Sequence, residues 1–186
     1  SIKSMEIKIF YSKDWLASAE ASAGKQDYEL LDTGEGEKLE RFGKYTFIRP
    51  YEDAFWPKAL TQEMKDKWGK ADGKFWSSKV GAKAGWIYNV QHPMLHTKWE
   101  MEYRGIKFMA SPTPFRHLGF FPEQASHWDF IETRLREASA RQGKIKFLNL
   151  FGYTGVASLF ALRAGAEVTH VDASKQTLNW AKENQK

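Results

Sequence analysis

The 186-residue sequence contains no cysteine, which excludes disulfide bonds and thiolate metal ligands and fits a cytoplasmic protein. It has no apolar run near the roughly 20 residues that a helix needs to cross a bilayer, and no secretory-type apolar stretch near residue 1. Its histidines show no metal-ligand spacing: His92 and His96 are four residues apart, but Pro93 between them argues against a helix. We therefore expect a cytoplasmic protein without a membrane segment or a metal site.

Internal repeats, low-complexity tracts and dense blocks of lysine and arginine are also missing, so nothing resembles a basic nucleic-acid-binding arm. The formal net charge of +5 and the pI of about 9.2 are nonetheless compatible with a nucleic-acid partner. Isolated cations such as Arg49 and Arg116 could contact phosphates, although such residues are more often simply solvated. Hydrophobic residues make up 42% of the chain, which is enough for a packed core.

The pattern of the chain changes near residue 112. Before it, short strand-like runs alternate with turn residues. The runs are 27–32, 39–42, 45–49, 74–77, 86–90, 99–103 and 106–110. A stretch with helical spacing, 60–68, interrupts them and ends at Gly69. The last two runs are joined by Arg104-Gly105, which favours a tight hairpin. Residues 1–111 are thus predicted to form a small, strand-rich α+β domain that is largely antiparallel.

After a proline-containing connector, residues 112–186 show longer helical patterns that alternate with apolar runs. A helix is predicted over 125–141, with Trp128, Ile131 and Leu135 on one face. The nearly continuous apolar run 145–151 is typical of a parallel strand buried on both faces. A tight loop at 152–155, a helix over 156–164, a strand over 167–171 and a helix capped by Ser174 follow. This order predicts the start of a doubly wound α/β sheet.

The segment that indicates chemistry is 149–155, which reads Asn-Leu-Phe-Gly-Tyr-Thr-Gly, together with Asp172 at the end of the next strand. Ligands of such sheets bind at the carboxyl ends of the strands, where glycines allow close approach of the backbone. The following helix presents free N–H groups, and a carboxylate at the second strand end can accept both hydroxyl hydrogens of a ribose. The spacing from Gly152 to Asp172 matches the roughly 20 residues expected of a nucleoside site.

The loop fits a dinucleotide poorly. A dinucleotide fingerprint reads Gly-x-Gly-x-x-Gly, but only Gly152 and Gly155 are present and bulky Phe151 and Tyr153 flank the first. A ligand without phosphate, such as S-adenosylmethionine (SAM), tolerates this loop better. Two alternatives stay open on the residues alone: a nicotinamide-binding oxidoreductase domain, and ordinary turn glycines with Asp172 acting as a helix cap.

These residues resemble a known family. The segment 149–155, the Val-Asp-Ala-Ser of 171–174 and the Asn-Trp-Ala-Lys-Glu-Asn of 179–184 look like motifs I and II of class I SAM-dependent methyltransferases. More narrowly, they resemble the bacterial 23S rRNA cytosine-C5 methyltransferases. The Gly-Phe-Phe-Pro-Glu-Gln of 119–124 is similar to the element that precedes the core there and helps to form the SAM pocket. The resemblance is specific over 115–184 and only architectural before that.

The resemblance implies a Rossmann-like methyltransferase sheet, SAM as cofactor and an rRNA substrate. Asp172 would hold the ribose hydroxyls, Ala173 and Ser174 would lie beside the adenine, and Phe121 and Gln124 would close the pocket. The implied cofactor-binding residues are Phe121, Gln124, Asn149, Phe151, Gly152, Tyr153, Thr154, Gly155, Asp172, Ala173 and Ser174.

Two predicted parallel strands are fewer than a doubly wound sheet needs, so we expect the sheet to be incomplete and the catalytic half to lie beyond residue 186. Methylation at cytosine C5 normally needs a thiolate that adds to the ring, and none exists here. The catalytic residues are therefore not assigned. The alternatives are a methyltransferase for a small molecule or protein, the oxidoreductase domain, and a non-catalytic module that keeps the pocket. The oligomeric state, a homodimer included, is left open.

Overall fold

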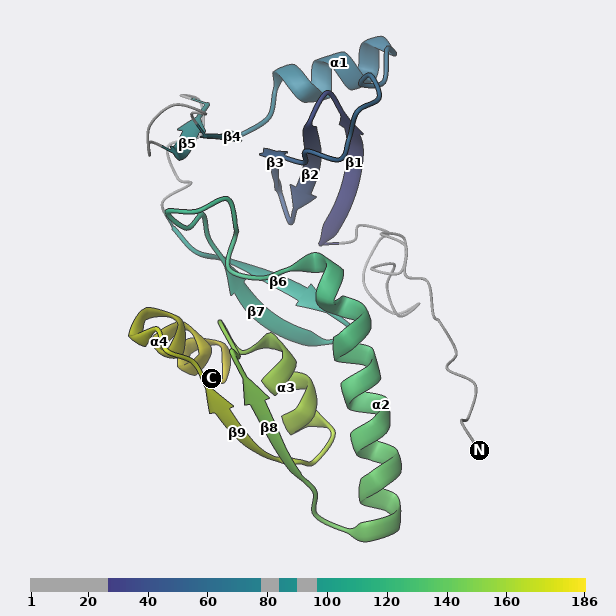
Figure 1. Cartoon of the computed structure of the whole chain (residues 1–186), viewed down its shortest axis with the longest axis vertical. Coiled ribbons are helices and arrows are strands. Elements are labelled where there is room, and N and C mark those ends of the chain that lie inside the picture. The colour runs from purple at the N-terminus through teal and green to yellow at the C-terminus, as the bar shows by residue number, and fades with distance from the viewer. Residues whose placement is uncertain (1–26, 78–83, 90–96) are drawn as a thin grey trace.

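The computed structural model describes residues 27–77, 84–89 and 97–186 (Figure 1). Val90 of the predicted strand 86–90, together with His92 and His96, lies outside the described residues. None of the described helices combines the length and apolarity that a bilayer crossing requires. The elements in chain order are β1 (Tyr28–Gly34), β2 (Glu37–Phe42), β3 (Tyr45–Pro50), α1 (Gln62–Gly69), β4 (Gly73–Ser77), β5 (Ala84–Tyr88), β6 (Trp99–Tyr103), β7 (Ile106–Ala110), a 3-10 turn (Pro122–Gln124), α2 (Ala125–Gln142), β8 (Lys146–Leu150), α3 (Val156–Arg163), β9 (Glu167–Val171) and α4 (Lys175–Asn184).

A five-stranded sheet with the order β1-β2-β3-β4-β5 forms one end of the molecule (Figure 1). Its neighbours pair antiparallel except β3 and β4, which are parallel. A parallel pair needs a crossover, and α1 supplies it. The helix starts at Thr61, whose hydroxyl accepts the Met64 N–H and so satisfies one of the free donors of the first turn. The prediction of a strand-rich, largely antiparallel region is confirmed.

The hairpin of β6 and β7 lies between this sheet and the helices α2 to α4 (Figure 1). Tyr103 pairs with Ile106, so only Arg104 and Gly105 form the turn. Both have positive φ, 48° and 77°, which is the type I′ geometry that suits the twist of a two-residue hairpin. Gly105 was the sequence signal for this turn, and the prediction is confirmed.

The remaining elements follow the predicted order, helix, strand, helix, strand, helix. The strands β8 and β9 pair parallel, from Lys146 opposite Glu167 to Leu150 opposite Val171, and α3 crosses between them. Beyond α3, Gly165 adopts φ 86° and its N–H bonds to the Leu162 carbonyl, so the helix ends there as a left-handed glycine predicts. This is the start of a doubly wound sheet.

One buried aromatic cluster links the two parts of the chain. Phe42 of β2 meets Phe120 with ring centroids 5.7 Å apart, and Phe120 meets Phe108 of β7 at 4.8 Å. Trp128 of α2 stacks on Phe160 of α3 at 5.6 Å, and all five side chains belong to one cluster. Each such ring contributes roughly 1.5–3 kcal/mol by burial. The predicted boundary near 111 stays a prediction, since this cluster crosses it.

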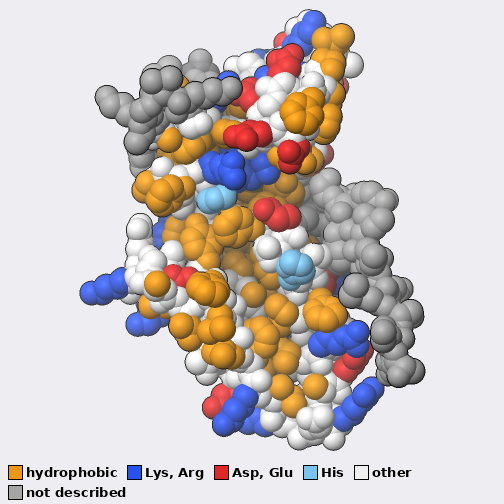
Figure 2. Space-filling view, viewed as in Figure 1, with side chains coloured by type: hydrophobic (Ala, Val, Ile, Leu, Met, Phe, Trp, Pro, Cys, Tyr) orange, Lys and Arg blue, Asp and Glu red, His pale blue; other side chains and the backbone are white. Residues whose placement is uncertain are grey.

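The prediction that β8 is buried on both faces is wrong. Leu148 and Leu150 are 57% and 55% exposed, whereas Phe147 packs with residues of α2 and α3. In a strand, alternate residues point to opposite faces. Here α2, α3 and α4 all pack on the face that carries Phe147 and Val168, and no described element covers the other. Hydrophobic side chains accordingly gather at the surface over β8 and β9 (Figure 2).

Candidate functional site

The loop 151–155 leaves β8 at the carboxyl edge of the parallel pair, next to the end of β9. The Gly152 N–H donates to the Val171 carbonyl at 2.9 Å, and the Gly155 N–H donates to the Gly152 carbonyl at 3.0 Å. Phe151 and Tyr153 adopt φ 55° and 53°, a left-handed region that costs a non-glycine residue roughly 1–2 kcal/mol. Such strained residues cluster at functional sites, so this loop is the first place to look for one.

Packing against β9 also requires a glycine at position 152. A Cβ atom placed on it would lie 2.3 Å from Cε1 of the His170 imidazole. From the sequence, the absence of a side chain at Gly152 was interpreted as allowing the backbone to approach a ligand closely. The ring of His170 on β9 fills that space and supports the loop from below.

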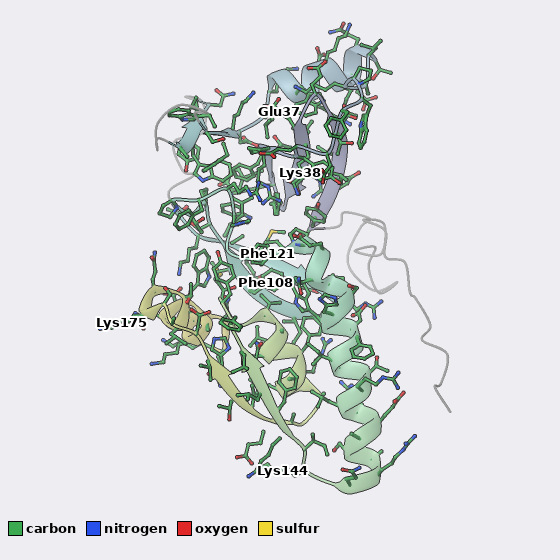
Figure 3. The ribbon with its side chains drawn as sticks, in the orientation of Figure 1. Glu37, Lys38, Phe108, Phe121, Lys144 and Lys175 are labelled. Atoms are coloured by element: carbon green, nitrogen blue, oxygen red, sulfur yellow. The ribbon has the colours of Figure 1, made fainter. Side chains whose placement is uncertain are left out.

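A cavity of about 280 Å³ lies between this loop and the segment before α2. Its walls are Phe120, Phe121, Gln124, Trp128, Asn149, Leu150, Phe151, Gly152, Tyr153, Thr154, Val156 and Ala157. Among these described lining residues there is no charged side chain. The Phe121 and Tyr153 rings face each other with centroids 5.4 Å apart. Along the long axis of the molecule, Phe121 lies between Lys38 of the five-stranded sheet and Phe108 of the hairpin (Figure 3).

A chain of hydrogen bonds fixes the amide of Asn149 at the end of β8. Its Nδ2 donates to Oγ of Ser158 at 3.0 Å, and that oxygen lies 2.9 Å from Nδ1 of His170. Gln124, on the opposite wall, has its Oε1 2.6 Å from Nδ1 of His127. Both cavity amides are therefore held in place by neighbours and present a fixed pattern to a ligand.

Thr154 ties the loop to the opposite wall. Its hydroxyl donates to the Gly119 carbonyl at 2.6 Å, and its own carbonyl accepts Nδ2 of Asn184 at 2.8 Å. Oδ1 of Asn184 in turn accepts the Met109 N–H at 2.9 Å. Buried and partly buried hydrogen bonds thus join the loop, the upstream segment, α4 and β7, and they hold the cavity in shape.

The Asp172 carboxylate turns toward the loop, as the sequence predicts. Its Oδ2 accepts the Tyr153 N–H at 2.9 Å, while its Oδ1 accepts the Ser174 N–H and the Thr177 hydroxyl at 2.9 and 2.8 Å. The Ser174 N–H, and after it the Thr177 hydroxyl and Tyr153 N–H, hold the pKa of Asp172 below its usual value. Burial, with the Asp172 charge, raises the pKa of Tyr153.

The structure brings most of the predicted binding residues together, but not all. Phe121, Gln124, Asn149, Phe151, Gly152, Tyr153 and Thr154 line the cavity. Gly155 instead lines a separate hollow between α3 and α4, and Asp172, Ala173 and Ser174 line neither. A carboxylate has about four acceptor positions, and three of those on Asp172 are occupied. As placed, it can accept one ribose hydroxyl hydrogen rather than the two expected.

Five lining residues were not predicted: Phe120, Trp128, Leu150, Val156 and Ala157. The helical spacing of Trp128 with Ile131 and Leu135 indicated a core position, and Trp128 is indeed buried, with 3% of the residue exposed. Phe120 and Leu150 stood inside the segments 119–124 and 149–155 that the sequence singled out, and this position was the recognisable signal. Within the described residues, no three His, Asp or Glu side chains group as metal ligands would.

Two curated relatives of this chain share one name. No family model matches the sequence. The "Ribosomal RNA large subunit methyltransferase K/L" of Colwellia psychrerythraea is 30% identical over 191 residues, which cover 92% of this chain and 24% of that protein. The protein of the same name from Alteromonas mediterranea is 40% identical over 86 residues, 46% of this chain and 11% of its own.

Solved structures agree on the fold. A SAM-dependent methyltransferase from Agrobacterium tumefaciens superposes with a TM-score of 0.74 at 41% identity, covering 88% of this chain and 49% of that one. One from Streptococcus mutans, at 17% identity and a TM-score of 0.55, shares the fold. The predicted fold class, the start of a Rossmann-like methyltransferase sheet, is confirmed. The chain spans about half of the Agrobacterium protein and a quarter or less of the two curated relatives.

Proposed function

We propose that the cavity between the 151–155 loop and the segment before α2 binds SAM, and that the chain belongs to a SAM-dependent methyltransferase. The observation that carries this proposal is the absence of charged groups among the described lining residues. A dinucleotide pyrophosphate needs cations or several aimed N–H groups. SAM carries a sulfonium cation instead, and aromatic faces such as those of Phe121 and Tyr153 attract cations.

Seven of the predicted residues then have a defined role. Phe121 and Tyr153 would border the sulfonium, while the amides of Asn149 and Gln124 would hydrogen-bond the polar ends of the methionine part. Asp172 would accept one ribose hydroxyl hydrogen, with Ala173 and Ser174 beside the adenine. Bound SAM supplies an electrophilic methyl group, and this chain would hold it in a cavity that shields it from water.

Calorimetric titration with SAM and, in parallel, with NADH tests the cofactor. We expect saturable binding of SAM and none of NADH. The matched variants are Ala157→Phe, which fills the cavity, and Leu148→Phe, which adds the same ring on the exposed face of β8. Only the first should abolish SAM binding. Binding of NADH alone would replace this proposal with an oxidoreductase domain.

We further propose that the methyl acceptor is RNA, and rRNA in particular. The support is the name shared by the two curated relatives, together with the net charge of +5. An rRNA substrate also favours the predicted cytoplasmic location. Phosphate contacts release counterions, so binding of rRNA fragments should weaken steeply as salt is raised. Affinity no better than that for a small acidic protein would favour the small-molecule or protein acceptor instead.

The acceptor atom is a separate, finer prediction. The resemblance implies cytosine C5, but the relatives' names give no acceptor atom, and none of these 186 residues is the thiolate that C5 chemistry uses. Mass spectrometry of nucleosides from rRNA incubated with the protein and SAM decides it. 5-Methylcytidine supports the prediction, and a methylated purine contradicts it.

A further inference from the structure

We propose that Arg49 of β3 is a positioning residue for the cofactor cavity: from the five-stranded sheet it holds the segment 116–124, which forms one wall. This inference rests on the proposed SAM site. The sequence suggested a solvated cation or a phosphate contact for Arg49, but its side chain is buried, with 4% of the residue exposed. It therefore acts inside the protein.

The guanidinium of Arg49 makes three directed contacts. Its Nε and Nη2 donate to the two carboxylate oxygens of Glu40 at 2.6 and 2.7 Å, and its Nη1 donates to the Arg116 carbonyl at 3.1 Å. Glu40 is fully buried and is also held by the Tyr28 hydroxyl at 3.0 Å and by Lys38 at 3.2 Å. The planar fork of arginine can serve both partners at once, which a lysine ammonium does less well.

A buried ion pair is weak grounds for a stabilising role, because desolvation of two charges offsets their attraction. The pair instead fixes the orientation of the Arg49 guanidinium. The remaining nitrogen of Arg49, Nη1, bonds the backbone at Arg116, the first residue of the segment 116–124 that forms the wall. Glu40 orients Arg49, and Arg49 in turn orients the chain.

Two routes lead from Arg49 to the cavity. The first runs through Arg116 to His117, whose ring packs against Phe121 at 4.7 Å, and Phe121 faces Tyr153. The carbonyl of His117 also accepts the Thr113 hydroxyl at 2.8 Å, so this turn is held at both sides.

The second route runs from the guanidinium through aromatic rings. The Arg49 guanidinium lies over the Phe42 ring, 5.2 Å from its centroid, and Phe42 packs edge-on against Phe120 at 5.7 Å. Both routes end at neighbouring residues that line the cavity, Phe120 and Phe121. The guanidinium thus supports this wall through its backbone and through its side chains.

The test compares two variants of the same buried cluster. Arg49→Lys keeps a cation for Glu40 but loses the fork that reaches Arg116, whereas Tyr28→Phe removes a hydrogen bond on the far side of Glu40. We expect both to lower the melting temperature. Only Arg49→Lys should weaken SAM binding, by about fivefold or more, as is typical for coupled sites. Only Arg49→Lys should speed amide hydrogen exchange over 117–124.

A second variant covers the case in which Arg49→Lys does not fold. Glu40→Leu with Arg49→Met replaces the pair by apolar side chains of similar size, a change that proteins often tolerate. It should fold, bind SAM less tightly and exchange faster over 117–124. If wild-type protein binds SAM and these variants bind it equally well, the positioning role is refuted. If wild-type protein does not bind SAM, the proposed function fails, and unchanged exchange over 117–124 would then refute the positioning role independently.

Discussion

The five-stranded sheet and the β8–β9 pair treat their apolar residues in opposite ways. In β3 the inward residues Tyr45 and Phe47 are 7% and 0% exposed, because Trp99 of the hairpin β6–β7 packs against both rings. In β8 the outward residues Leu148 and Leu150 are more than half exposed. An apolar run in the sequence therefore indicates that the side chains of a strand can be buried. It does not indicate which helices or strands will cover them.

The two regions also differ in where they place charge. The five-stranded sheet buries Glu40 and Arg49 as a paired cluster, while the described lining of the cavity beside β8 carries no charge at all. A buried charge is tolerated where its partner is fixed beside it. The fixed ion pair therefore lies in the sheet, outside the cavity. The uncharged lining of the cavity leaves room for a cationic ligand.

The largest expected effect tests the contrast in burial. Phe160→Ala removes a fully buried ring that stacks on Trp128, and it should lower the free energy of unfolding by about 3–5 kcal/mol. Leu150→Ala, on the exposed face of β8, should cost less than about 1 kcal/mol. Urea unfolding of both variants measures the difference. Equal losses would mean that the exposed face is in fact covered in solution.

The next effect tests how closely the segment before α2 packs against α4. A Cβ on Gly119 would lie 2.5 Å from the Trp180 ring, and this glycine has φ 94°. Gly119→Ala should therefore cost about 3 kcal/mol, from left-handed strain together with overpacking. Gly165→Ala is the matched control, because it has φ 86° at the end of α3 but open space around it. Its loss should be about 1 kcal/mol, and thermal unfolding that ranks the two in reverse would contradict the close contact.

The smallest effect concerns pH. Burial, and then the charges of Arg49 and Arg116, lower the pKa of His117 from 6.5. The unfolded chain therefore takes up this proton first as the pH falls. The contribution of His117 to the free energy of unfolding is fully present above pH 6.5. It declines as the pH drops from there to the lower folded pKa, and it is constant below that pKa. His117→Gln should remove this part of the pH profile, as followed by urea unfolding between pH 7.5 and 5. A variant profile that matches the wild type would show that His117 does not titrate on unfolding.

Most of the fold could be predicted from local pattern. The bounds of β6, β7 and β9 match the apolar alternation residue for residue, because Gly105 and the apolar-to-polar steps define their ends. Gly165 and Ser174 end and begin helices as their chemistry requires. The exposure of Leu148 could not be predicted, since it depends on which helices share a face.

The site was predicted less completely, for a physical reason. Motif spacing places the loop and Asp172 at one edge of the sheet, but it cannot tell how many acceptor positions Ser174 and Thr177 already occupy. It also assigns Gly152 to a ligand, although the ring that excludes a side chain belongs to His170. The role of Arg49 was missed because its partner Glu40 lies on another strand, and a buried pair looks like two surface charges in the sequence.

A crystal structure of the chain grown with S-adenosylhomocysteine would show whether the cavity is the cofactor site. We expect density for the ligand in the cavity between Phe121, Gln124, Asn149 and Tyr153, with one ribose hydroxyl on Oδ2 of Asp172. Density in the separate hollow between α3 and α4, or an empty cavity at saturating ligand, would contradict it.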